Sequence, residues 1–128
     1  MVWRDEDGAG FTAPGVEPWL PIGSRERNVA DQRDDPRSIL TLTRDLIGLR
    51  RHRALLTGDY EPLEAPADVW AFRRRGGALV AVNLGDRPAR LDRVDGAIVL
   101  CTDRARDGEV ARGELELGPR QGLVVSAA

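Results

Sequence analysis

The sequence lacks lysine altogether, and all 19 of its basic residues are arginine. The arginines are spread along the chain and are matched by 21 acidic residues, which leaves a formal net charge of −2. A chain with so little net charge has no strong field that would attract nucleic acid or an anionic membrane surface. We therefore expect neither nucleic acid nor a membrane as a partner.

Histidine and cysteine occur only once each. The lone Cys101 excludes an internal disulfide and a cysteine-based metal site, and we expect it to be a small buried residue of a strand. His52 cannot form a histidine cluster for a metal, and its position in an arginine-rich helix end favours a role at the helix dipole or at the surface. We expect no metal and no other cofactor.

Long apolar runs are missing too. The longest are a handful of residues, at Ala78–Val82 and Ala97–Cys101, whereas a membrane-spanning helix needs about 20. Residues 1–7 are acidic, in contrast to the basic and then apolar start of a signal peptide. These features predict a cytoplasmic protein.

What is present divides the 128 residues into three zones. The first, residues 1 to about 34, is rich in Gly, Pro, Asp and Arg and shows neither a helical nor a strand period, which predicts a long irregular segment. It contains three large aromatic residues, Trp3, Phe11 and Trp19. An irregular segment with several aromatic side chains is typically ordered against another surface and has a function.

The second zone is predicted to be one amphipathic helix, from residue 36 to about residue 53. Asp35 is a suitable N-cap, and Pro36 suits the first helical position, because its missing N–H would have no intrahelical partner there. Arginines crowd the last turn, where positive charge suits the helix dipole. The apolar residues recur at helical spacing and need a substantial partner surface; they are Ile39, Leu40, Leu42, Leu46, Ile47 and Leu49.

The third zone, from about residue 58 to residue 128, is predicted to form strands. An alternating run at residues 69–75 and an apolar run at residues 78–83 flank Gly76 and Gly77, which is a hairpin signal. Shorter strands are expected at residues 89–91, 97–102, 114–117 and 122–126. A helix followed by such strands predicts an α+β fold with an antiparallel sheet or small sandwich.

No group of residues forms a self-contained active site by its spacing. The acidic clusters Asp5–Asp7 and Asp34–Asp35 are neighbours in polar segments, whereas a glycosidase needs two carboxylates that face each other about 5–9.5 Å apart across a bond. The serines, Ser24, Ser38 and Ser126, lack the context of a nucleophile, and the glycine-rich stretches match no phosphate-binding fingerprint. We therefore predict no catalytic residue in this chain.

Seven short motifs within residues 1–63 resemble the segment that closes the catalytic barrel in family 13 glycoside hydrolases of the α-glucosidase, oligo-1,6-glucosidase and trehalose synthase branch. They stand in the same order and at short intervals, which makes the resemblance specific. Residues 64–128 resemble the C-terminal β-domain of these enzymes only in pattern, as in the run at residues 80–83. In order, the motifs are Met1–Trp3, Gly8–Thr12, Glu17–Pro21, Asn28–Val29 with Gln32, Asp35–Pro36 with Ser38, Leu46–Arg50 and Gly58–Tyr60.

The resemblance implies that residues 1–54 are the loop after barrel strand eight with the last barrel helix, and that residues 55–128 are the C-terminal antiparallel β-domain. In these enzymes the catalytic carboxylates precede the equivalent of Met1, and a complete barrel needs about 250 residues. The resemblance therefore implies a C-terminal fragment that is inactive alone. It also implies that Trp3, Phe11 and Trp19 lie near the mouth of a sugar site.

Two functions remain open at this point. In the first, the chain is the C-terminal fragment of an α-glucosidase-like glycoside hydrolase of carbohydrate metabolism. Its partner would then be the missing catalytic barrel, as in a split enzyme, or a second copy bound through the exposed helix face. In the alternative, the chain is a noncatalytic β-module that binds an oligosaccharide or a partner protein through aromatic side chains.

Overall fold

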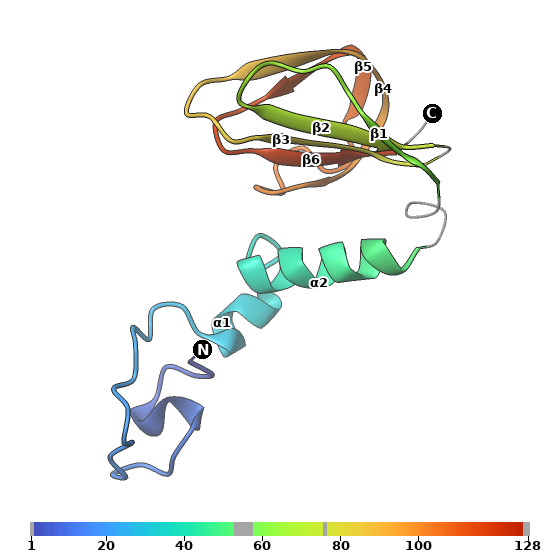
Figure 1. Cartoon of the computed structure of the whole chain (residues 1–128). Coiled ribbons are helices and arrows are strands. Elements are labelled where there is room, and N and C mark those ends of the chain that lie inside the picture. The colour runs from blue at the N-terminus through green and yellow to red at the C-terminus, as the bar shows by residue number, and fades with distance from the viewer. Residues whose placement is uncertain (1, 53–57, 76, 127–128) are drawn as a thin grey trace. The chain divides into compact units, whose positions relative to one another are not determined.

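The computed structural model describes residues 2–52, 58–75 and 77–126, in which two helices are followed by a six-stranded antiparallel sheet (Figure 1). This arrangement confirms the predicted α+β fold. The chain divides into two compact units, Met1–Asp45 and Leu46–Ala128. The predicted domain boundary between residues 54 and 55 lies outside the described residues.

The first unit contains a short helix, α1 (Val29–Asp34), that the sequence did not predict. Asn28 caps it, because its side-chain Oδ1 accepts the Asp31 N–H at 2.9 Å. The Val29 N–H donates to the Val2 carbonyl at 3.0 Å and so ties the helix to the start of the chain. Six residues are too few to show a helical period, which is why the segment looked irregular.

The second helix, α2 (Ile39–Arg51), begins at Ile39 and not at Pro36 as predicted. Ser38 provides the cap that was assigned to Asp35, since its Oγ accepts the Thr41 N–H at 3.1 Å. Asp35 instead has φ −92° and ψ 111°, because a residue that precedes proline is disfavoured in the helical region.

None of the side chains of α2 is buried. In its predicted apolar stripe, Ile39 is 69% exposed, Leu46 40% and Ile47 49%. The helix ends at Arg51, and the predicted end at residue 53 lies outside the described part of the chain. Leu40, Leu42 and Leu49, the other residues of the stripe, are half-buried, and the predicted partner surface of the helix stays a prediction.

All strand pairs of the second unit are antiparallel, and the order of the strands in the sheet is β1-β2-β3-β6-β4-β5. The predicted hairpin is confirmed, because β2 pairs with β3 in register from Val69 opposite Asn83 to Arg73 opposite Leu79. Gly76 of its turn lies outside the described residues. The strands are β1 (Tyr60–Pro62), β2 (Val69–Arg74), β3 (Leu79–Asn83), β4 (Ala89–Cys101), β5 (Val110–Leu117) and β6 (Gly122–Val125).

Strand β4 is one strand of 13 residues, whereas the sequence predicted two short strands. The polar stretch between them stays in the sheet through a register shift between Asp92 and Val94 and through Gly96, whose positive φ of 142° favours glycine. Strand β5 starts before the predicted residue 114 because Gly113, with φ 81°, is accommodated within it. Strand β1 was missed since its three residues are all exposed and show no alternation.

The second unit has one hydrophobic core, to which β2–β6 all contribute. Strand β4 extends around it, because its first part pairs with β5 and its last part with β6. The alternation along β2 places Val69 and Ala71 in this core and Trp70 on the opposite face. The buried residues of the core are Val69, Ala71, Leu79, Ala81, Leu91, Val94, Ile98, Cys101, Ala111, Leu115, Leu117, Leu123 and Val125.

A buried asparagine stabilises the turn that follows β3. Asn83 is 1% exposed, and its Nδ2 donates to the carbonyls of Arg87 at 2.8 Å and Gly118 at 2.9 Å. Its Oδ1 accepts the Gly85 N–H at 2.9 Å. One side chain thus pairs three backbone groups from two loops that are distant in sequence.

We expect Asn83→Ala to lower the free energy of unfolding by about 2–4 kcal/mol, because buried backbone groups would lose their partners. Urea denaturation followed by circular dichroism would measure the change. Asp86→Ala is the control, since it removes an exposed ion pair with Arg120 and should cost less than about 1 kcal/mol. Equal effects of the two variants would show that Asn83 does not hold the loops.

Candidate functional site

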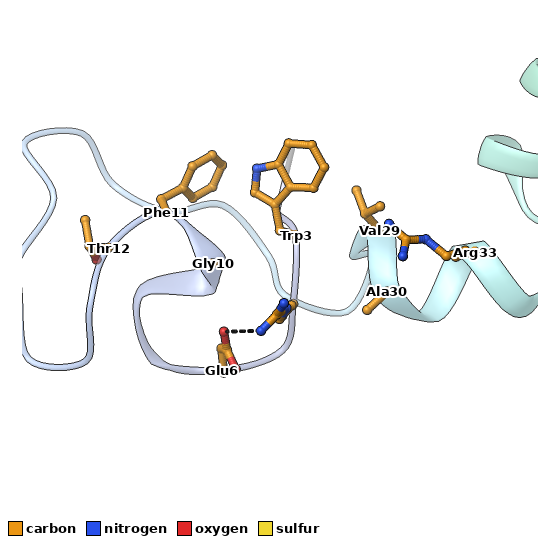
Figure 2. A pocket seen from close by; sticks show the side chains of 9 residues that line it. Trp3, Glu6, Gly10, Phe11, Thr12, Val29, Ala30 and Arg33 are labelled. Atoms are coloured by element: carbon orange, nitrogen blue, oxygen red, sulfur yellow. Dashed lines mark ion pairs between the residues drawn. The ribbon is translucent and has the colours of Figure 1, made fainter.

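The three aromatic residues singled out by the sequence are all exposed in the first unit, at 50% for Trp3, 55% for Phe11 and 91% for Trp19. Trp3 and Phe11 line one hollow of about 440 Å³ (Figure 2). Phe11 and Trp19 line a second hollow of about 560 Å³, with Pro18 and Leu20 in its wall. The structure thus brings Phe11 together with each tryptophan.

The backbone around Trp3 is fixed from two sides. Its N–H donates to the Ala9 carbonyl at 3.1 Å, and its carbonyl accepts the Ala30 N–H from α1 at 3.0 Å. Gly10 has φ 79°, and a Cβ built on it would lie 2.8 Å from the Trp3 Cβ. The glycine therefore allows the loop to pass directly against the tryptophan, which gives the motif at residues 8–12 a physical role.

Charged side chains of both signs line the hollow beside Trp3. Arg4 Nη1 lies 3.6 Å from Glu6 Oε1 in an exposed ion pair, and Arg33 of α1 lines the same hollow (Figure 2). Sequence reasoning missed these residues, because Glu6 was assigned to a solvated acidic cluster and the arginines carried no motif. The hollow can offer an aromatic face together with hydrogen-bond donors and acceptors.

The other acidic residues of this unit support its loops. Asp7 Oδ2 accepts the Gly15 N–H at 2.8 Å, and Asp7 Oδ1 lies 3.9 Å from Arg25 Nη2. Asp35 Oδ1 accepts the Arg37 N–H at 2.8 Å. These bonds give both carboxylates a role in holding backbone turns.

Cys101, at the end of β4, is buried as predicted, with 0% of its surface exposed. Its thiol donates to Asp103 Oδ1 at 2.9 Å, and Gln121 Nε2 donates to Asp103 Oδ2 at 2.8 Å. Burial, together with the bond to Asp103, raises the pKa of the thiol. The same bond and the Ala105 N–H lower the pKa of the Asp103 carboxyl. Burial and the bond to Asp103 thus both favour the thiol over the thiolate.

His52 is exposed, and its backbone N–H donates to the Leu49 carbonyl at 3.1 Å. Within residues 2–52, 58–75 and 77–126, no group of three or more His, Cys, Asp and Glu side chains is placed to hold a metal ion. Neither helix of these ranges is long and apolar enough to cross a bilayer.

Three known proteins match the chain at moderate identity, among them a hydrolase and a glucosidase. Trehalose-6-phosphate hydrolase of Escherichia coli is 38% identical over 78 residues, which are 58% of this chain and 14% of that protein. The salivary α-glucosidase of Anopheles gambiae is 35% identical over 95 residues, which are 70% of this chain and 16% of that protein. No protein-family model matches the chain.

Solved structures match nearly the whole chain. Trehalulose synthase of Pseudomonas mesoacidophila covers 98% of it with a TM-score of 0.79 and 29% identity, and isomaltulose synthase of Klebsiella sp. covers the same share with a TM-score of 0.80. The chain spans 24% of the length of each synthase. The chain is the counterpart of the C-terminal part of family 13 α-glucosidase-type enzymes.

Two of the motifs on which the predicted resemblance rests take part in backbone hydrogen bonds. Ser38 Oγ, besides capping α2, donates to the Gln32 carbonyl at 2.6 Å. The Leu40 N–H donates to Gln32 Oε1 at 3.2 Å. Gln32 and Ser38 thus join the end of α1 to the start of α2, and the motif residues serve to build the scaffold.

We expect the Cys101 thiol of the folded chain to react with a disulfide reagent such as dithionitrobenzoate at least about tenfold more slowly than that of the chain unfolded in urea, because the reaction needs an accessible thiolate. The release of thionitrobenzoate at pH 8 measures both rates. The unfolded chain is the internal control. Similar rates would mean that the end of β4 opens readily and that the hydrogen bond to Asp103 does not slow the reaction of the thiol.

Proposed function

We propose that this chain forms the C-terminal part of an α-glucosidase-like glycoside hydrolase of carbohydrate metabolism, whose catalytic carboxylates lie outside these residues. The observation that carries the proposal is the match of 98% of the chain to only 24% of two sugar-converting synthases. In such an enzyme the chain supplies the loop after the last barrel strand, the last barrel helix as α2, and the C-terminal β-domain.

The exposed stripe of α2 supports this assignment. Its residues Ile39, Leu46 and Ile47 are 40–69% exposed on a helix with no buried side chain. An amphipathic helix gains most of its stability in a protein from packing of its apolar face. An outer barrel helix packs this face against the strands of the barrel, and we assign the stripe to that contact.

The hollow between Trp3 and Phe11 is proposed to lie beside the sugar site of the intact enzyme. Barrel enzymes build their active sites from loops at the carboxyl ends of the strands. Ligand sites commonly combine aromatic walls with a few polar groups, as Trp3, Phe11, Arg4 and Glu6 do here. These residues would position the substrate, and the reacting carboxylates would come from the rest of the barrel.

We also propose a cytoplasmic location for the enzyme. Cys101 is unpaired and buried, and free thiols are usual in a reducing compartment.

The purified chain is expected not to hydrolyse nitrophenyl α-glucoside or maltose, because it contributes no catalytic carboxylate. Co-expression with the coding sequence immediately upstream of it should restore turnover if that sequence encodes the catalytic barrel. Release of nitrophenol measures both preparations, and the upstream product alone is the control. Turnover by the chain alone that is abolished by a substitution within it would refute the proposal.

The alternative function as a noncatalytic module is tested on the same purified chain. Calorimetric titration with millimolar maltose and isomaltose should produce no binding heat beyond that of dilution. Saturable heat that is lost in Trp3→Ala would favour the binding module over the enzyme part.

In the assembled enzyme, Trp3→Ala and Phe11→Ala are expected to raise KM by about tenfold or less with a smaller change in kcat, because an aromatic contact contributes about 0.5–1.5 kcal/mol. Steady-state kinetics with maltose and with a nitrophenyl glucoside would separate the two constants. Val16→Ala is the control, as it removes an exposed apolar side chain, 53% accessible, from outside this hollow. An unchanged KM in both aromatic variants would exclude contact with the substrate.

A further inference from the structure

Strand β5 is the last strand of the sheet, and one of its two edges is free. Among the described residues it pairs with β4 alone, from Leu117 opposite Ala89 to Val110 opposite Ala97. The backbone N–H and C=O groups along its other edge are therefore open to a further antiparallel strand. No proline, which would block such pairing, occurs in β5.

The side chains of β5 that point away from the core carry charges of both signs. Ala111, Leu115 and Leu117 are buried in the core, while Arg112 and Glu114 between them are exposed. Charged side chains commonly protect a free edge, because charges of one sign repel a second strand. This protection is weak in β5, since an arginine of one copy attracts a glutamate of another.

Pairing within the chain leaves Glu114 in an unfavourable position. The residue opposite it on β4 is Asp92, and like charges directly opposite each other destabilise a sheet. Arg112 lies opposite Asp95, yet neither Arg112 nor Glu114 forms an ion pair with any residue that the structure describes. A cation that approaches Glu114 from outside the chain would relieve its repulsion with Asp92.

One register of a second copy of β5 supplies this cation. With a two-fold axis at Gly113, Arg112 of each copy lies opposite Glu114 of the other. A shift by two residues would place either Glu114 opposite Glu114 or Arg112 opposite Arg112, and a shift by one would turn core residues outward. Gly113, with φ 81°, brings no side chain to the axis, and its N–H already donates to Asp95 Oδ1 at 3.0 Å.

We propose that the free edge of β5 binds the same strand of a second copy of this chain, with Gly113 on the two-fold axis and Arg112–Glu114 ion pairs on both sides of it. Such a contact is isologous and continues the sheet from one copy into the other. It uses one strand from each copy and is small, so association depends on chain concentration and weakens as salt screens the exposed ion pairs. The pairing does not depend on the proposed enzymatic function.

Charge reversal tests both the contact and its register in the purified chain. Analytical ultracentrifugation should show reversible dimers of the wild type. Glu114→Arg and Arg112→Glu should each weaken the dimer by at least about tenfold, because each places like charges opposite each other on both sides of the axis. An equimolar mixture of the two variants should associate again, since every arginine of one then lies opposite a glutamate of the other. Glu116→Arg is the matched control, because it makes the same change of charge opposite Val110 and should keep the wild-type affinity.

Several outcomes would overturn the proposal. They are a wild-type chain that stays monomeric at its highest soluble concentration, a dimer that neither charge reversal weakens, and a mixture of the two variants that fails to associate. Hydrogen exchange read by mass spectrometry adds a test without substitution, since raising the concentration of the wild type should slow amide exchange in β5. Slowing confined to α2 or to β1 and β2, or slowing in β5 only when the upstream catalytic part is present, would assign the edge or the dimer otherwise and refute the proposal. Circular dichroism and urea midpoints separate a loss of association from a loss of folding.

Discussion

The burial of apolar side chains between the two parts of the curved sheet is the constraint on which the second unit depends. Thirteen buried residues fill this core, and they come from five strands of the same unit. Long β4 makes this possible, since it pairs with β5 along its first part and with β6 along its last. The unit thus fills its inner face with its own residues.

The first unit is held together differently, mainly by hydrogen bonds to backbone groups. Asn28, Gln32 and Ser38 cap or link its helices, and Trp3 is fixed between a loop carbonyl and an N–H of α1. Such bonds define the path of the chain but bury little apolar surface. This explains why its aromatic residues, and Ile39 at the start of α2, stay exposed.

The fold could be predicted from the sequence where one local signal dominates. The alternating run at residues 69–75 and the apolar run at residues 78–83, with the glycine pair between them, were sufficient for the hairpin. Cys101 was correctly placed in a buried strand position. The start of α2 was wrong because two capping residues compete, and the proline displaces Asp35 from the helix in favour of Ser38. The sequence did not show that residues 89–101 form one strand. The register shift and the conformation of Gly96 that keep this strand continuous depend on its pairing with strands distant in sequence.

The candidate site, too, could be predicted only in part, because it joins residues with a sequence motif to residues without one. Sequence motifs indicated Trp3 and Phe11, yet the polar residues that line their hollow, Arg4, Glu6 and Arg33, come from segments without a signal of their own. The contacts of the Phe72 ring with the rings of Tyr60 and Trp70 could not be predicted either, since Tyr60 reaches Phe72 only through the pairing of β1 with β2. The motif residues Asn28, Gln32 and Ser38 indicated the resemblance because they fix the backbone path around α1 and the start of α2. Relatives that act on different sugars can share such a backbone path. In the proposed enzyme this chain would therefore contribute shape and support to the catalytic barrel, with Trp3 and Phe11 as its contact with the sugar.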